Sequence, residues 1–141
     1  MDMNIERGID QIRQKFEIIG YPLETYEQEG TTFLLGSIQG NEDVYPFLFT
    51  QDDDEDLAGV RLITDALFRS QAPKLGKVLE RINDLQMRDV FFKFMLDSEN
   101  AIRVGYDFPP DCPDIGELAP GLVQQLASFL DKNLPELREI A

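Results

Sequence analysis

The chain has 141 residues, of which 43% are hydrophobic and 28% charged; 13 basic residues against 27 acids give a formal net charge of −14. This length and composition predict one soluble domain over residues 1–141. Nucleic acids and anionic membranes are disfavoured partners, because both attract positive charge. The absence of histidine excludes histidine-dependent catalytic groups, and one cysteine cannot build a zinc site, so we expect no enzyme, cofactor or metal.

The sequence carries no targeting signal that we recognise. Residues 1–16 lack the apolar core of a signal peptide, and no stretch reaches the roughly 20 apolar residues of a membrane span. Cys112 has no second cysteine with which to form an intrachain disulfide, which suits a reducing compartment. We therefore expect a cytoplasmic protein. Its acidity either keeps it soluble or complements a basic protein partner.

Residues 3–20 predict an amphipathic helix, because five apolar residues recur at helical spacing on one face: Ile5, Ile9, Ile12, Phe16 and Ile19. Asp2 or Asn4 can cap its start, and Gly20 with Pro22 ends it. The narrow apolar stripe faces either the core of the domain or a second helix in an oligomer.

Four strands are expected next, at residues 25–29, 32–39, 45–51 and 57–67. Their short connections predict an antiparallel meander. A second helix is expected at residues 72–85, with four residues on its buried stripe: Leu75, Val78, Leu79 and Ile82.

A hairpin over residues 90–97 and 102–107 should follow, and then a proline-rich link. Asp114 and Glu117 have the spacing of a helix start. Pro120 begins or kinks this third helix, and Pro135 is expected to begin a last short turn. The fold class is therefore α+β, an antiparallel sheet with three helices in the order α-β-β-β-(β)-α-β-β-α.

Several strands carry large apolar residues on both faces, whereas a sheet that is wet on one side alternates apolar with polar residues. Three opposed sets show this pattern: Phe33 and Leu35 against Leu34 and Ile38, Phe47 and Phe49 against Leu48, and Phe92 and Phe94 against Phe91 and Met95. Three helices can cover one face, so the other is covered within the chain, by a second copy or by a partner. We expect Phe91, Lys93 and Met95 to share one strand face and to bind protein.

Two polar features of the sequence are candidate chemical sites. The acids from Asp52 to Asp56 lack the alternating spacing of a calcium loop and are typical of a solvated turn. Cys112 is expected to be an inert thiol, because neighbouring acids disfavour its thiolate. An alternative function, binding of a divalent metal or small ligand by carboxylates, stays open.

Three segments together resemble the YbjN-type domain group: Leu79-Glu80-Arg81-Ile82-Asn83-Asp84-Leu85, Phe92-Lys93-Phe94-Met95-Leu96-Asp97 and Ile102-Arg103-Val104. That group looks like the type III secretion chaperone fold, whose members are small, acidic, cytoplasmic and usually homodimeric. The resemblance covers roughly residues 3–134. It implies a non-enzymatic binding module, chaperone-like or regulatory, and it carries no catalytic residues to this chain. We therefore expect a homodimer with an unidentified protein partner.

Overall fold

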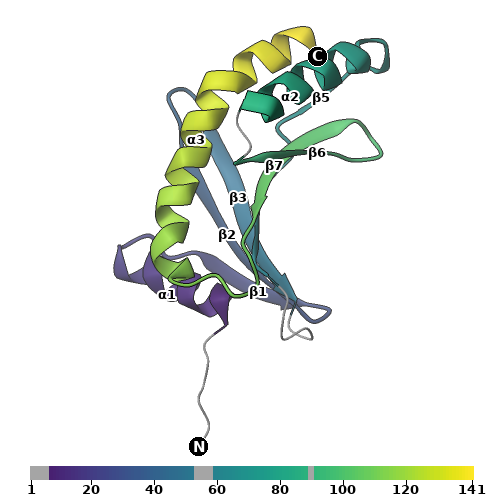
Figure 1. The fold of residues 1–141 in the computed structure, drawn as a ribbon. Coiled ribbons are helices and arrows are strands. Elements are labelled where there is room, and N and C mark those ends of the chain that lie inside the picture. The colour runs from purple at the N-terminus through teal and green to yellow at the C-terminus, as the bar shows by residue number, and fades with distance from the viewer. Residues whose placement is uncertain (1–6, 53–58, 89–90) are drawn as a thin grey trace, which may run out of the picture.

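The structure is a computed structural model that describes residues 7–52, 59–88 and 91–141 (Figure 1). Three α-helices, one 3₁₀ turn and seven strands follow one another in an α+β order that confirms the predicted fold class. The elements are α1 (Gly8–Ile18), β1 (Glu24–Gln28), β2 (Thr31–Gln39), β3 (Val44–Asp52), β4 (Arg61–Thr64), β5 (Phe68–Arg69), η1 (Ala72–Lys74), α2 (Leu75–Arg88), β6 (Lys93–Leu96), β7 (Ala101–Asp107) and α3 (Ile115–Ile140).

All strand pairs in the described sheet are antiparallel, in the order β1-β2-β3-β4-β7-β5. Strands β1 to β4 form the predicted meander. Strand β7 pairs with β4 and β5 along one edge and with β6 along the other. The predicted strand at residues 57–67 is shorter than expected, and β5 is a two-residue strand that the sequence pattern did not predict.

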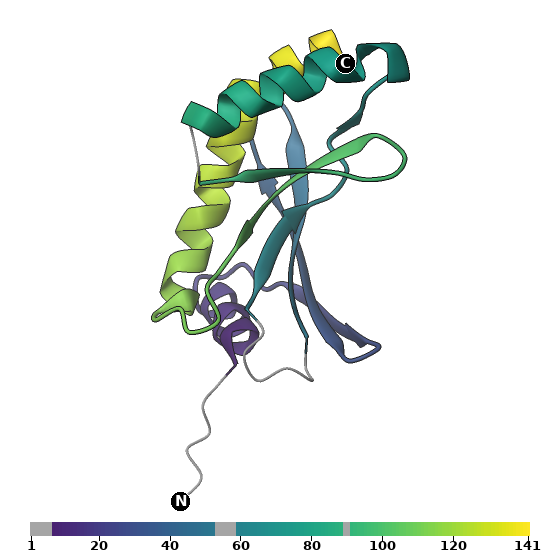
Figure 2. The ribbon, with the colours of Figure 1, turned by 45° about the vertical axis from the view of Figure 1, so that its right-hand side comes forward.

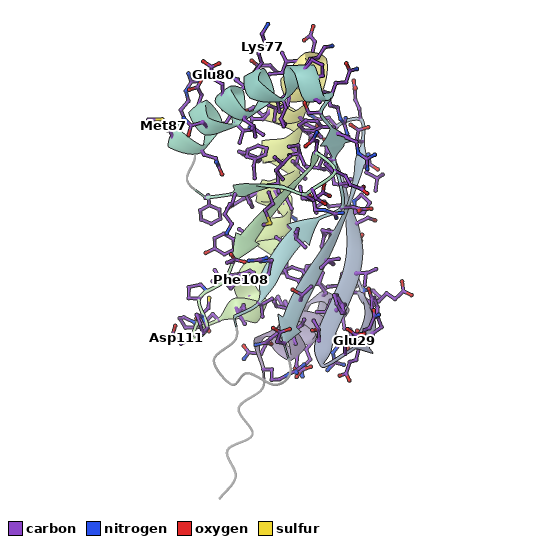
Figure 3. All side chains as sticks on the ribbon, turned by 90° about the vertical axis from the view of Figure 1, so that its right-hand side faces the viewer. Glu29, Lys77, Glu80, Met87, Phe108 and Asp111 are labelled. Carbon is purple, nitrogen blue, oxygen red and sulfur yellow. The ribbon has the colours of Figure 1, made fainter. Side chains whose placement is uncertain are left out.

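The helices α1 and α3 lie together on one side of the sheet, and α2 crosses the upper end of α3 (Figures 1 and 2). Between these helices and the strands lies the main core, which includes Ile9, Phe16, Leu34, Phe49 and Leu126. A second buried cluster joins α2 to the end of α3 through Val78, Ile82, Leu85, Ile102 and Leu137. We call the side packed against α1 and α3 the covered face, and the opposite side, seen in Figure 3, the open face.

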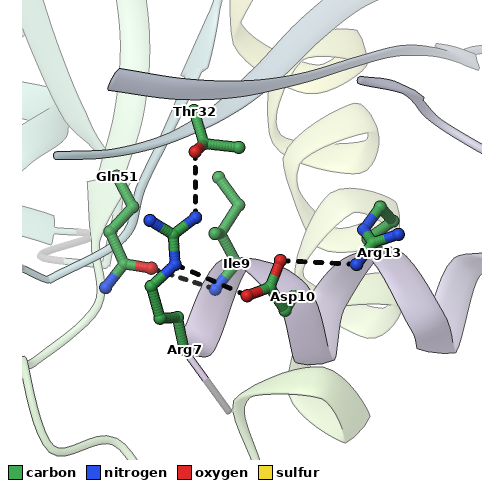
Figure 4. A network of polar contacts seen from close by, with 6 residues as sticks. All are labelled: Arg7, Ile9, Asp10, Arg13, Thr32 and Gln51. Atoms are coloured by element: carbon green, nitrogen blue, oxygen red, sulfur yellow. Dashed lines mark hydrogen bonds and ion pairs between the residues drawn. The ribbon is translucent and has the colours of Figure 1, made fainter. Parts of the chain in front are cut away.

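Contacts distant in sequence fix the beginning of α1 on the sheet (Figure 4). The Gln51 side-chain carbonyl on β3 accepts a hydrogen bond from the Ile9 backbone N–H (3.1 Å), a donor that the first turn leaves unpaired. Arg7 donates to the Thr32 hydroxyl on β2 (2.9 Å) and contacts Asp10 (3.4 Å). The sheet therefore supplies the cap that we expected from Asp2 or Asn4, which lie outside the described residues.

Several details of the predicted helices differ. Ile19 and Leu79 were expected on buried stripes but are 50% and 40% exposed, and Ile5 lies outside the described residues. Asp114 has a left-handed backbone (φ 56°) and makes no side-chain cap bond, so the predicted cap is absent. Pro135 lies inside α3 instead of beginning a new turn. Leucines on both sides of it, Leu134 and Leu137, stay buried in the two core clusters and hold the helix in one piece.

Candidate functional site

The open face carries an apolar strip across the middle of the sheet. Strand register places Leu35, Leu48, Ile63 and Gly105 side by side on β2, β3, β4 and β7. The three large residues are half-buried, although their neighbours Leu34, Phe49 and Leu62 are 0% exposed on the covered face. The open face is therefore only partly covered at this strip, whereas the covered face is fully buried there.

Met95 on β6 extends the strip. A Cβ placed on Gly105 would come within 2.6 Å of the Met95 Cε and of the Leu62 backbone carbonyl. The methionine side chain therefore lies over Gly105, in space that any larger residue at position 105 would fill. We name Leu35, Leu48, Ile63, Gly105 and Met95 the central strip. Beyond one end of it, Tyr26 stacks on Phe33 with ring centroids 4.9 Å apart.

Ion pairs border the central strip. Asp107 accepts from Arg61 (2.6 Å) and from Lys93 (3.1 Å), and Asp65 pairs with Arg103 (3.3 Å). The Arg61 guanidinium, more than the Lys93 ammonium, holds the pKa of Asp107 below its usual range. With Glu24, which pairs with Leu35 in the β1–β2 ladder, three cations and three acids surround the strip. The three cations bring positive charge to this part of a chain whose net charge is −14.

The structure separates the three residues that we expected to share one face. Lys93 and Met95 lie on the open face, through the Asp107 ion pair and the Gly105 contact. Phe91 precedes β6 and lies at the edge of the sheet. Its ring stacks on Tyr106, with centroids 5.0 Å apart, and Tyr106 pairs with buried Leu62. Strand β6 begins at Lys93, so strand alternation does not extend back to position 91.

A cleft that the sequence reasoning missed lies between α2, α3 and the segment before β6. Its volume is about 770 Å³. Arg81, Leu85 and Arg88 line it from α2, and Phe91 and Phe92 from the next segment. Helix α3 contributes residues that recur on one face: Gly121, Gln124, Gln125, Ser128, Phe129, Lys132 and Asn133. We call this the cationic cleft.

The two polar features weighed from sequence yield no site among the described residues. Asp52 is exposed and accepts from the Thr31 hydroxyl (2.8 Å), whereas the acids at 53–56 lie outside the described residues. Within residues 7–52, 59–88 and 91–141, no three acidic or cysteine side chains gather into a possible metal site. Burial, followed by the charges of Asp111 and Asp114, raises the pKa of the Cys112 thiol. A raised pKa disfavours the reactive thiolate.

Within the part of the chain that the structure describes, no helix combines the length and the apolar character needed to cross a membrane. No protein-family model and no curated protein matches the chain. The resemblance to YbjN-type domains accordingly stays a prediction.

Proposed function

We propose that this chain is a non-enzymatic protein-binding protein of the cytoplasm, and that it acts as a homodimer whose two copies pack open face against open face. The observation that carries the proposal is the central strip with its border of ion pairs. A partly exposed apolar centre inside a charged rim is the usual anatomy of a protein interface.

The apolar side chains give the driving force. Leu35, Leu48, Ile63 and Met95 each keep part of their surface in water. Covering the remaining apolar surface is favourable by roughly 25 cal/mol for each Å². Two antiparallel sheets pack face to face with their layers about 10 Å apart, which leaves room for one interdigitated layer of such side chains.

Charge decides where two copies can meet. Each copy has a net charge of −14, so most surfaces of one copy repel those of another. Around the central strip the repulsion is weakened locally, because Arg61 and Lys93 pair with Asp107, and Arg103 pairs with Asp65. A twofold axis through this face places the same patch on both copies, which suits a self-complementary surface. The resemblance to YbjN-type domains also implies a homodimer.

The test is the oligomeric state of matched variants. Leu48→Glu places a carboxylate in the central strip, and Leu118→Glu changes the same residue type on an exposed position (52%) in the first turn of α3. Static light scattering should give a dimer for the unchanged protein and for Leu118→Glu, and a monomer for Leu48→Glu. Circular dichroism should show the same secondary structure in all three.

Two results would contradict the proposal. One is a monomer for the unchanged chain at a concentration of about 100 μM, at which a functional dimer should be populated. The other is a dimer that survives Leu48→Glu and also Met95→Asp, because these substitutions put uncompensated charge at two places in the proposed interface.

A further inference from the structure

We infer that the cationic cleft is a binding site for a small aromatic anion, in which cations hold a carboxylate or phosphate group and phenylalanine rings contact the flat apolar part. The inference does not depend on the proposed homodimer, because the lining residues of the cleft do not belong to the central strip. It assigns a ligand to the cationic cleft, which has no part in the proposed homodimer.

The charges of the cleft are opposite to those of the molecule. Arg81, Arg88 and Lys132 line it, and none of its described lining residues is an acid. Three of the chain's 13 basic residues therefore gather here, although its net charge is −14. Glu136, 2.9 Å from Arg81, offsets part of this positive charge, whereas acids more than about 8 Å away are largely screened in physiological salt.

These cations have donors left for a ligand. Arg81 donates from Nη2 to Glu136 on α3 (2.9 Å), while its buried Nε has no hydrogen-bond partner in the described structure. Arg88 and Lys132 form no ion pair with another described residue. A guanidinium has five N–H donors in a fixed plane, which suits the paired oxygens of a carboxylate or phosphate.

Aromatic rings provide the apolar part of the cleft. Phe92 and Phe129 are buried at its base, with ring centroids 5.3 Å apart. Phe91 meets Phe92 edge-on (centroids 5.4 Å apart) and is 46% exposed. A planar ligand group that packs against Phe91 would cover apolar surface and gain from aromatic contact geometry.

The remaining lining residues favour a small polar ligand over a purely apolar one. Gln124, Gln125 and Asn133 bring side-chain amides to the cleft, and an amide carries both donors and an acceptor. The Asn133 amide already donates one hydrogen bond to the Phe129 carbonyl oxygen (3.0 Å). A volume of about 770 Å³ falls within the usual range of sites for small molecules. A carboxylate and a phosphate satisfy the same cations, so the experiment separates the two sources of negative charge.

The test is isothermal titration calorimetry with four probes: 2-naphthoate, adenosine 5′-monophosphate, adenosine and inorganic phosphate. We expect at least one of the two aromatic anions to bind with a Kd below about 1 mM, and adenosine and phosphate to bind roughly tenfold more weakly. Preference for naphthoate assigns a carboxylate ligand, and preference for the nucleotide assigns a phosphate. The inference would be overturned if inorganic phosphate or adenosine bound as tightly as the better aromatic anion. It would also be overturned if neither aromatic anion bound.

Charge-removing variants locate the site. Lys132→Gln and Arg88→Gln should each weaken the aromatic anion at least about fivefold, because each removes one charged donor. Lys77→Gln is the matched control, since Lys77 is an exposed residue of α2 that does not line the cleft (Figure 3). An equal loss in Lys77→Gln, or no loss in both cleft variants, would overturn the assignment. Thermal unfolding without ligand should give the same midpoint for all three.

Discussion

The two faces of the sheet begin from similar sequence and reach different environments. Leu34 and Leu35 are neighbours on β2, as are Leu48 and Phe49 on β3, yet only Leu34 and Phe49 are fully buried beneath α1 and α3. Polar contacts differ in the same way. On the covered face they join helix to sheet, and on the open face they join strand to strand. Apolar residues on both faces of a strand therefore indicate that both faces favour burial. The positions of the helices decide which of the two faces is buried within the chain.

The largest expected effect separates the faces directly. Phe49→Ala should lower the free energy of unfolding by about 3–5 kcal/mol, because it leaves a cavity among rings and aliphatic side chains. Leu48→Ala, next in sequence but on the open face, should cost about 1 kcal/mol or less in the monomer. Urea unfolding at low protein concentration measures both. Equal losses would mean that the open face is as well packed as the covered one.

A tight helix crossing on the covered face gives the next largest effect. A Cβ at Gly116 would lie 2.8 Å from the Gln11 backbone carbonyl, where α3 crosses α1. Gly116→Ala should therefore destabilise the protein by about 1–3 kcal/mol through overpacking. Gly121→Ala, in the same helix with nothing within 4 Å, should instead stabilise it by up to about 1 kcal/mol. Thermal unfolding of the two variants checks the opposite signs.

The hydrogen bond between Tyr45 and Asp131 on the covered face should make a moderate contribution to stability that depends on pH. The Tyr45 hydroxyl donates to Asp131 on α3 (2.7 Å), and burial, followed by this bond, raises the pKa of Tyr45. Tyr45→Phe should cost about 1–2 kcal/mol at neutral pH. Because the folded-state pKa is raised, the stabilisation from this hydrogen bond is fully present below the unfolded tyrosine pKa of about 10. It is lost as the pH rises through the higher, folded-state pKa.

The measurement for Tyr45 is chemical unfolding of the unchanged protein and of Tyr45→Phe across the alkaline range. The difference between them should shrink as the pH rises above about 10, where the unchanged protein loses the contribution that the variant never had. If the difference in unfolding free energy instead grew with pH in this range, the hydrogen bond from Tyr45 to Asp131 could not be its source.

The smallest effect is expected on the open face. The pKa of Asp107 is lowered by Arg61 first and then by Lys93, so its ion pairs stabilise the fold above the unfolded value of about 3.9. This contribution is lost as the pH falls through the lower, folded-state pKa. Asp107→Asn should cost less than about 1 kcal/mol at neutral pH, because the group is 43% exposed. Acid titration of both proteins should show the gap closing below about pH 4.

Local patterns in the sequence were sufficient for the fold class. Period-two and helical spacing placed three helices and the meander, because those periods are properties of the backbone. They could not place Ile19 and Leu79, which have the right spacing but lie beyond the surface that neighbouring elements cover. Nor could they find β5, since Phe68 and Arg69 form a strand only by pairing with β7.

The candidate sites were predicted unequally for the same reason. Alternation within β6 placed Lys93 and Met95 on one face, and the open face lies where the two-faced strands indicated. The cationic cleft escaped, because Lys132 is 44 residues from Arg88 and no motif links them. Tertiary packing of α2 against α3 brings these residues to one opening, and spacing along a single helix cannot reveal it.

The order of the elements, with α3 after all seven strands, has a consequence for biosynthesis. The ribosome completes the ribbon from Glu24 to Thr64 about fifty residues before Ile115 leaves the exit tunnel. Until then only α1 can cover Leu34 and Phe49, and the part of the covered face that packs against α3 stays exposed to water. Transiently exposed apolar surface and unpaired strand edges favour aggregation, so the growing chain is most vulnerable in the interval before α3 emerges.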